Sequence, residues 1–131
     1  MAESIYIITT SDAPRAIGPY SQALKVRAPD LVFVSGQLGI DPATGEFAGQ
    51  TVAEQTRRCL ENLMAILGGG ARRFTVVKTT VYLADMGMFA EMNEVYKTFF
   101  SEPYPARACV AVRELPKGAL VEIEAIAAVE G

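Results

Sequence analysis

Histidine and tryptophan are absent from this 131-residue sequence, and cysteine occurs only twice, at Cys59 and Cys109. Without histidine, one chain cannot form a Ser-His-Asp triad, a histidine proton shuttle or an imidazole metal site. Two cysteines are too few for a disulfide framework or a four-thiolate zinc site. The plain interpretation is a pair of free thiols in a reducing compartment.

Positive charge and long apolar runs are also scarce. Lysine and arginine number 12 against 15 acidic residues, and the pI is near 5.0. Nucleic-acid binding usually needs a basic surface, so this balance counts against it, although a local patch stays open. No apolar run reaches the roughly 18 residues of a membrane span, and the first residues lack the features of a secretory signal. We expect a cytoplasmic protein without membrane contact.

Apolar residues make up 50% of the chain, which predicts a packed core. No linker, repeat or shift of composition divides the sequence, so we expect residues 1–131 to form a single domain.

The hydrophobic periodicity predicts an α+β fold, with two helices on one face of a mixed sheet. One helix begins at Thr51, which has capping-box spacing with Glu54, and ends at the glycines of residues 68–70. Asp85 caps a second helix, whose apolar stripe contains Phe89 and Tyr96. Strands are expected at residues 5–8, 31–34, 74–83, 107–113 and 119–129, the last two paired as a hairpin.

The last strand predicts association with other copies. Alternate residues from Ala119 to Val129 form an apolar face, and the opposite face mixes Glu122 and Glu124 with apolar residues. A small chain with two partly apolar sheet faces is expected to bury the second one in an oligomer.

Two charged residues stand out in apolar surroundings. Arg107 opens a strand after the stiff segment Pro103-Tyr104-Pro105, which suits a fixed guanidinium fork for a carboxylate or phosphate. An ordinary ion pair is the more frequent reason for such an arginine. Glu122 lies inside the apolar last strand, either on a solvated face or buried at an interface, where it would need a partner.

Weaker signals come from polar residues near turns and on the second helix. Asn93 lies beside the apolar stripe, and the pattern alone favours a backbone partner for its amide. The segments around Tyr20 and around Ser35-Gly36 resemble loops whose backbone could bind an anion, although glycine and serine also mark ordinary turns. Cys109 shares a strand face with Arg107, and a buried structural thiol is the plainer interpretation.

Several segments together resemble the Rid (YjgF) family. They are Ile17-Gly18-Pro19-Tyr20-Ser21-Gln22, Val34-Ser35-Gly36-Gln37, Val77–Leu83, Met92-Asn93, Tyr96–Phe100, Pro105–Val110, Leu115-Pro116-Lys117-Gly118 and Val121–Ala125. They occur in the family's order and span nearly the whole chain.

This resemblance implies a chorismate-mutase-like fold and a homotrimer with ligand clefts between subunits. It also implies hydrolytic deamination of 2-imino acids, the reactive products of pyridoxal-phosphate enzymes, to 2-keto acids and ammonia. Arg107 would bind the substrate carboxylate, and Glu122 would position or activate water. The cleft would be lined by the residues that match family positions, namely Tyr20, Ser35, Gly36, Asn93 and the backbone of Cys109.

The implied chemistry needs no metal or other cofactor, because a protonated imine conjugated to a carboxylate is already electrophilic. Orientation by arginine and a proton shuttle at Glu122 would suffice. Whether Arg107 and Glu122 meet within one chain or across a subunit boundary depends on the register of the hairpin. The alternatives are a non-catalytic module that binds small carboxylates or acts as a chaperone and, less favoured by charge, an endoribonuclease.

Overall fold

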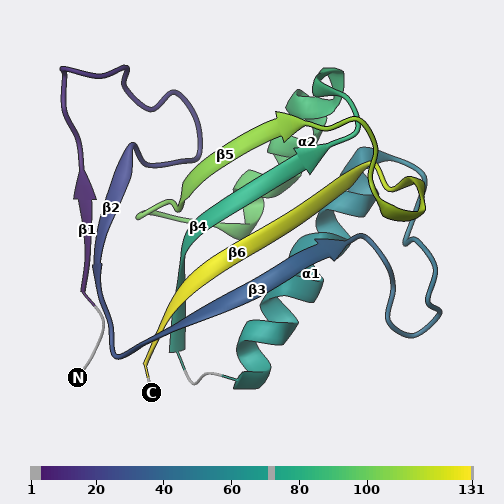
Figure 1. The fold of residues 1–131 in the computed structure, drawn as a ribbon, viewed down its shortest axis with the longest axis horizontal. Helices are drawn as coiled ribbons and strands as arrows, with labels where there is room; N and C mark the ends of the chain where they lie inside the picture. The colour runs from purple at the N-terminus through teal and green to yellow at the C-terminus, as the bar shows by residue number, and fades with distance from the viewer. Residues whose placement is uncertain (1–3, 71–72, 131) are drawn as a thin grey trace.

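The structure, a computed structural model, describes residues 4–70 and 73–130 (Figure 1). The strands are β1 (Ser4–Ile8), β2 (Ala23–Arg27), β3 (Asp30–Leu38), β4 (Arg73–Leu83), β5 (Ala106–Ala111) and β6 (Val121–Glu130). The helices are α1 (Val52–Gly70) and α2 (Phe89–Tyr96), with short 3-10 turns η1 (Met86–Met88), η2 (Lys97–Phe99) and η3 (Pro116–Gly118).

The main sheet has the strand order β3-β6-β4-β5, and both helices lie behind it in Figure 1. The expected α+β architecture, with two helices on one face of a mixed sheet, is therefore confirmed. In the described chain no helix combines the length and apolarity needed to cross a membrane. The sheet face opposite the helices, here called the open face, is covered by no helix of residues 4–70 and 73–130.

The expected hairpin of the last two strands is wrong, because β4 lies between them. β5 pairs in parallel with β4, and β6 pairs antiparallel with β4 and with β3. The chain passes from β4 through α2 to β5, and such a helical crossover returns the next strand parallel to the first. β6 then fills the centre of the sheet, a position that suits its high apolar content.

The core lies between the sheet and the helices. Alternate residues of β6 that include Val121, Ile123 and Ala127 are fully buried, as the period-two pattern predicts. They pack in one cluster with α1 residues such as Leu60 and Leu63. The expected capping box is present, because Thr51 Oγ1 accepts from the Glu54 backbone N–H at 3.1 Å and Glu54 Oε1 accepts from the Thr51 backbone N–H at 3.3 Å.

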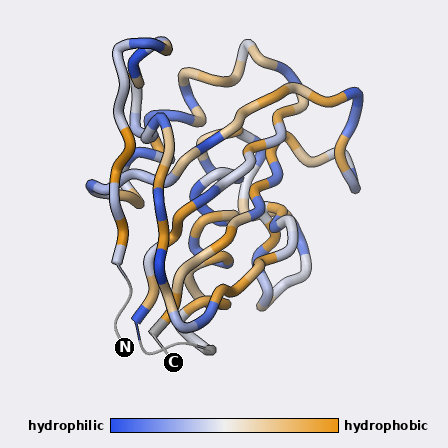
Figure 2. Tube along the Cα trace, turned by 60° about the vertical axis from the view of Figure 1, so that its left-hand side comes forward, coloured by the Kyte–Doolittle hydropathy of each residue, from blue (hydrophilic) through white to orange (hydrophobic). Residues whose placement is uncertain are grey.

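Two further parts of the chain differ from expectation. β3 does not end at Ser35 and Gly36 but continues to Leu38, with a bulge between Val34 and Gln37. β2 was not expected, and it pairs with β1 as a separate two-stranded sheet beside the main one (Figure 1). The isoleucines of β1 form an apolar stretch near the N-terminus (Figure 2), and Ile7 and Ile8 are exposed.

Candidate active site

Arg107 lies on β5, on the face of the sheet that the helices cover. Its partner on β4 is Thr79, whose side chain is buried and within 2.8 Å of the Tyr96 hydroxyl of α2. Residues directly paired across strands point to the same face. The pairing therefore directs Arg107 toward α2.

The Arg107 guanidinium is held by one hydrogen bond and three aromatic rings. Its Nη1 donates to Asn93 Oδ1 at 2.6 Å. Its Cζ lies 4.7 Å from the ring centre of Tyr96, 5.5 Å from that of Phe89 and 5.6 Å from that of Tyr20. Within residues 4–70 and 73–130, Arg107 makes no ion pair, and its hydrogen bond goes to the neutral amide of Asn93.

Three residues of α2 reach Arg107 from one stripe of the helix. Phe89, Asn93 and Tyr96 are spaced at i, i+4 and i+7, positions that share a helix face. The sequence predicted a backbone partner for Asn93, but its amide oxygen accepts from Arg107 instead. The sequence pattern places Phe89 and Tyr96 on the apolar stripe of the helix and gives neither a role in the site. Their spacing with Asn93 was the signal that could have placed them in the site.

Tyr20 reaches Arg107 from the loop between β1 and β2. Ser21 fastens this loop to the segment before β5, because its Oγ donates to the Tyr104 carbonyl at 2.6 Å and its backbone N–H to the Pro105 carbonyl at 3.3 Å. A Cβ built on Gly18 would lie 4.0 Å from Arg107 Nη2, so this loop also borders the guanidinium.

Cys109 follows Arg107 on the same face of β5 and pairs with Val81 of β4. Burial raises the pKa of its half-buried thiol, and the positive charge of Arg107 offsets only part of that effect. The thiol is therefore protonated at neutral pH and is not an activated nucleophile. Cys59 is fully buried, which confirms its assignment to the core. Burial, and to a smaller extent the charge of Glu122, raises the pKa of this thiol to about 12.

Glu122 lies on the other face of the sheet. Glu122 pairs with Tyr82 of β4, and Tyr82 follows Thr79 by three residues on that strand. The pairing between β4 and β6 has no bulge between these two β4 residues. Because successive residues of a strand alternate faces, Glu122 and Arg107 are on opposite faces. The sequence left open whether the two residues meet within one chain, and in this structure a single chain does not bring them together.

Glu122 has its own surroundings on the open face. Its carboxylate lies directly over Gly36, where a Cβ would collide with the carboxylate. Ser35 and Gly36 stand in the bulge of β3 and have no partner residue in the register with β6. The bulge therefore places Ser35 and Gly36 beside a half-buried carboxylate. They form a second group of predicted site residues that is separate from Arg107, Asn93 and Tyr20.

Metal ligands are not gathered at either location. Across the residues that the structure describes, no group of three or more histidine, cysteine, aspartate or glutamate side chains is placed to hold a metal ion.

Comparison with known proteins connects this geometry to a family. A family model described as endoribonuclease L-PSP matches residues 10–129. The RutC family protein y4sK of Sinorhizobium fredii is 61% identical, over 91% of this chain and 94% of that protein. The human 2-iminobutanoate/2-iminopropanoate deaminase is 48% identical, over 92% of this chain and 88% of that protein.

Solved structures give the same relationship. The structure of E. coli TdcF with bound serine is 46% identical and has a TM-score of 0.70, covering 96% of this chain and 99% of that one. RidA from the Antarctic bacterium Psychrobacter is also 46% identical, with a TM-score of 0.70 and coverage of 95% and 99%. The chain therefore belongs to the endoribonuclease L-PSP family, the family of the YjgF and Rid proteins.

Proposed function

We propose that this protein hydrolyses 2-iminobutanoate and 2-iminopropanoate to the corresponding 2-keto acids and ammonia. The observation that carries the proposal is that the Arg107 guanidinium is only partly hydrogen-bonded. Its Nη1 is used by Asn93, whereas Nε and Nη2 have no hydrogen-bond partner in the described part of the chain. One edge of the guanidinium is thus left for the two oxygens of a carboxylate, the bidentate arrangement that arginine favours. Relatives about half identical to this chain are named as deaminases for these imines.

The neutral character of Asn93 supports a substrate that carries a carboxylate. An amide oxygen fixes Nη1 without cancelling the positive charge, so the full charge is available to the substrate. The carboxylate bound there would hold the imine carbon in a fixed place. Orientation of this kind can supply a large part of a rate enhancement.

Water would then add to the imine carbon with the help of Glu122. The carboxylate accepts a proton from the attacking water as the C–O bond forms, which gives a tetrahedral carbinolamine. This proton passes from Glu122 to the nitrogen, and the C–N bond then breaks with its electron pair leaving on the nitrogen. Glu122 takes the hydroxyl proton of the carbinolamine as the C=O bond forms, and ammonia and the 2-keto acid leave. No electron donor or acceptor enters the reaction.

This reaction requires Arg107 and Glu122 on one substrate, and in a single chain they lie on opposite faces of the sheet. We therefore propose a homotrimer in which Arg107 of one copy and Glu122 of the next line the same cleft. The exposed apolar residues Leu31, Phe33 and Val110 on the open face support burial of that face against another copy. Arg107 lies on the edge strand β5, from which it can reach a neighbour.

The test is a coupled assay. An amino-acid oxidase generates 2-iminobutanoate in the presence of semicarbazide, which traps any imine that is not yet hydrolysed. We expect the wild-type protein to lower the yield of semicarbazone and Arg107→Ala to have no effect at the same concentration. Unchanged semicarbazone with the wild type, combined with saturable binding of 2-oxobutanoate, would contradict catalysis and favour a carboxylate-binding module. Cleavage of RNA by the wild type but not by Arg107→Ala would favour a nuclease instead.

A further inference from the structure

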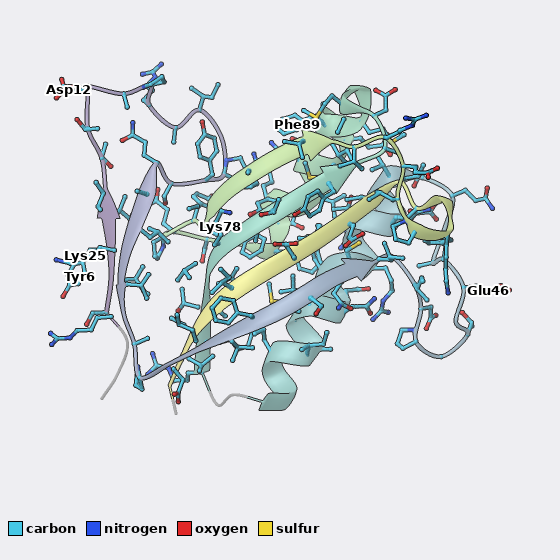
Figure 3. The ribbon with its side chains drawn as sticks, in the orientation of Figure 1. Tyr6, Asp12, Lys25, Glu46, Lys78 and Phe89 are labelled. Carbon is cyan, nitrogen blue, oxygen red and sulfur yellow. The ribbon has the colours of Figure 1, made fainter. Side chains whose placement is uncertain are left out.

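The stripe of α2 that faces Arg107 is unusual in its composition. A hydrogen-bond acceptor, Asn93, stands between two aromatic residues, Phe89 and Tyr96, and all three contact the same guanidinium. Phe89 lies where α2 and β5 come together (Figure 3). A single short helix thus supplies both the hydrogen bond and two of the ring contacts of Arg107.

The two rings differ in how firmly they are held. Tyr96 is completely buried, and its hydroxyl is fixed at 2.8 Å from Thr79 Oγ1. Its ring also packs on Phe100, with ring centres 4.7 Å apart. Phe89 is only partly buried and has no polar atom, so it can be exchanged with less disturbance of the core.

We propose that Phe89 and Tyr96 are positioning residues for Arg107, an inference that rests on the proposed binding of a substrate carboxylate by this arginine. Ring faces attract a guanidinium through their quadrupoles and restrict the motion of its plane. With Nη1 fixed on Asn93, contacts to the rings limit rotation about that hydrogen bond. The free edge formed by Nε and Nη2 is then presented in one orientation, so less freedom is lost when a carboxylate binds.

The test uses Phe89→Leu, which removes the ring and keeps an apolar side chain. Binding of 2-oxobutanoate, the product of the proposed reaction, is measured by titration calorimetry, and the KM and kcat for imine hydrolysis are measured alongside it. We expect the dissociation constant and KM to rise about threefold to tenfold, the range of a lost cation–π contact, and kcat to change by less than about twofold. Phe89→Tyr keeps a ring and is expected to restore most of the affinity lost in Phe89→Leu.

The matched control is Phe99→Leu. Phe99 is also partly buried against the core, but its ring lies 5.9 Å from Arg57 and not near Arg107. The same substitution there is expected to leave affinity for 2-oxobutanoate unchanged. Thermal unfolding of all variants shows whether they fold, and Phe89→Met replaces Phe89→Leu if the latter does not, because methionine fills irregular space well.

Equal affinity of wild type and Phe89→Leu, or equal losses in Phe89→Leu and Phe99→Leu, would overturn the positioning role. Loss of affinity in Phe89→Tyr equal to that in Phe89→Leu would also overturn it. These results are distinct from a failure of the proposed function, which is a wild type that binds 2-oxobutanoate and does not hydrolyse imines. The calorimetric comparison still decides the positioning role in that case.

Discussion

Gly36 and Glu122 show how a single missing side chain can place a functional group. The Glu122 carboxylate occupies the space where any other residue at position 36 would carry its Cβ. A bulge in β3 brings Gly36 to this point, and bulges often re-aim groups next to active sites. In the proposed reaction this packing fixes the oxygens that hold the attacking water.

Gly36→Ala is therefore expected to displace the Glu122 carboxylate and to reduce catalysis more than binding. We expect kcat to fall about 100-fold, as for other small misplacements of a catalytic group, and the dissociation constant of 2-oxobutanoate to change by less than about threefold. Steady-state kinetics and calorimetry measure the two effects separately.

Gly68→Ala is the control for that substitution. Gly68 lies near the end of α1 and has no atom within 4 Å of a Cβ built on it. Alanine there is expected to leave activity unchanged and to stabilise the helix slightly. A wild-type kcat in Gly36→Ala would contradict the role given to Glu122.

At the residue scale, the sequence indicated which side chains are unusual but not what they contact. The apolar stripe of α2 gave the correct burial of Tyr96, yet the same pattern fits a core residue and a residue that faces an arginine. The contact between Gly36 and Glu122 joins β3 to β6, which are distant in sequence. Such a contact depends on the sheet order, which local patterns do not contain.

At the scale of elements, one side chain joins the long loop before α1 to the start of β6. The buried Gln55 donates from Nε2 to the Gly49 carbonyl at 3.1 Å. Its Oε1 accepts from the Leu120 backbone N–H at 2.9 Å. Gly39 packs so closely on the backbone of Gln55 that a Cβ would lie 2.6 Å from its carbonyl oxygen. Gln55 thus sets the position of the chain just before Glu122.

Gln55→Leu is expected to lower the free energy of unfolding by about 1–3 kcal/mol, because the Leu120 N–H and the Gly49 carbonyl each lose their partner. Urea unfolding followed by circular dichroism measures this change. Gln50→Leu, an exposed position in the same loop, serves as the control and is expected to change stability by less than about 0.5 kcal/mol. Equal stability of Gln55→Leu and wild type would show that this connection does not hold the loop.

Element positions were largely predictable, and strand pairing was not. The alternation in β6 and the capping box of α1 are local patterns, so α1 and most strands agree with the prediction. The second helix is present, but Asp85 caps the 3-10 turn η1, and α2 begins only at Phe89. The hairpin error arose because neighbours in sequence often pair, whereas here the α2 crossover inserts β4 between β5 and β6. The sequence analysis does not include β2, although Leu24-Lys25-Val26-Arg27 alternates apolar and charged residues, because a pattern this short occurs equally in loops.

At the scale of the whole molecule, the two halves of the proposed site face away from each other. Arg107 and its aromatic surroundings lie on the helix side, and Glu122 lies on the open face with Phe33, which is 71% exposed. The mixed outer face of the last strand predicts association from the sequence alone. In the proposed trimer, the separation of Arg107 and Glu122 gives this association a further role, because a cleft between copies would bring both residues to one substrate.

The most direct test of the shared cleft is to mix two variants that are each expected to be inactive. Arg107→Ala and Glu122→Gln are each assayed alone, then denatured together in equal amounts, refolded and assayed for imine hydrolysis, with light scattering to confirm the trimer. If each site takes Arg107 from one copy and Glu122 from another, random mixing restores about a quarter of wild-type activity per site. If the mixture forms trimers and stays as inactive as its parents, both residues act within one chain and the shared cleft is contradicted.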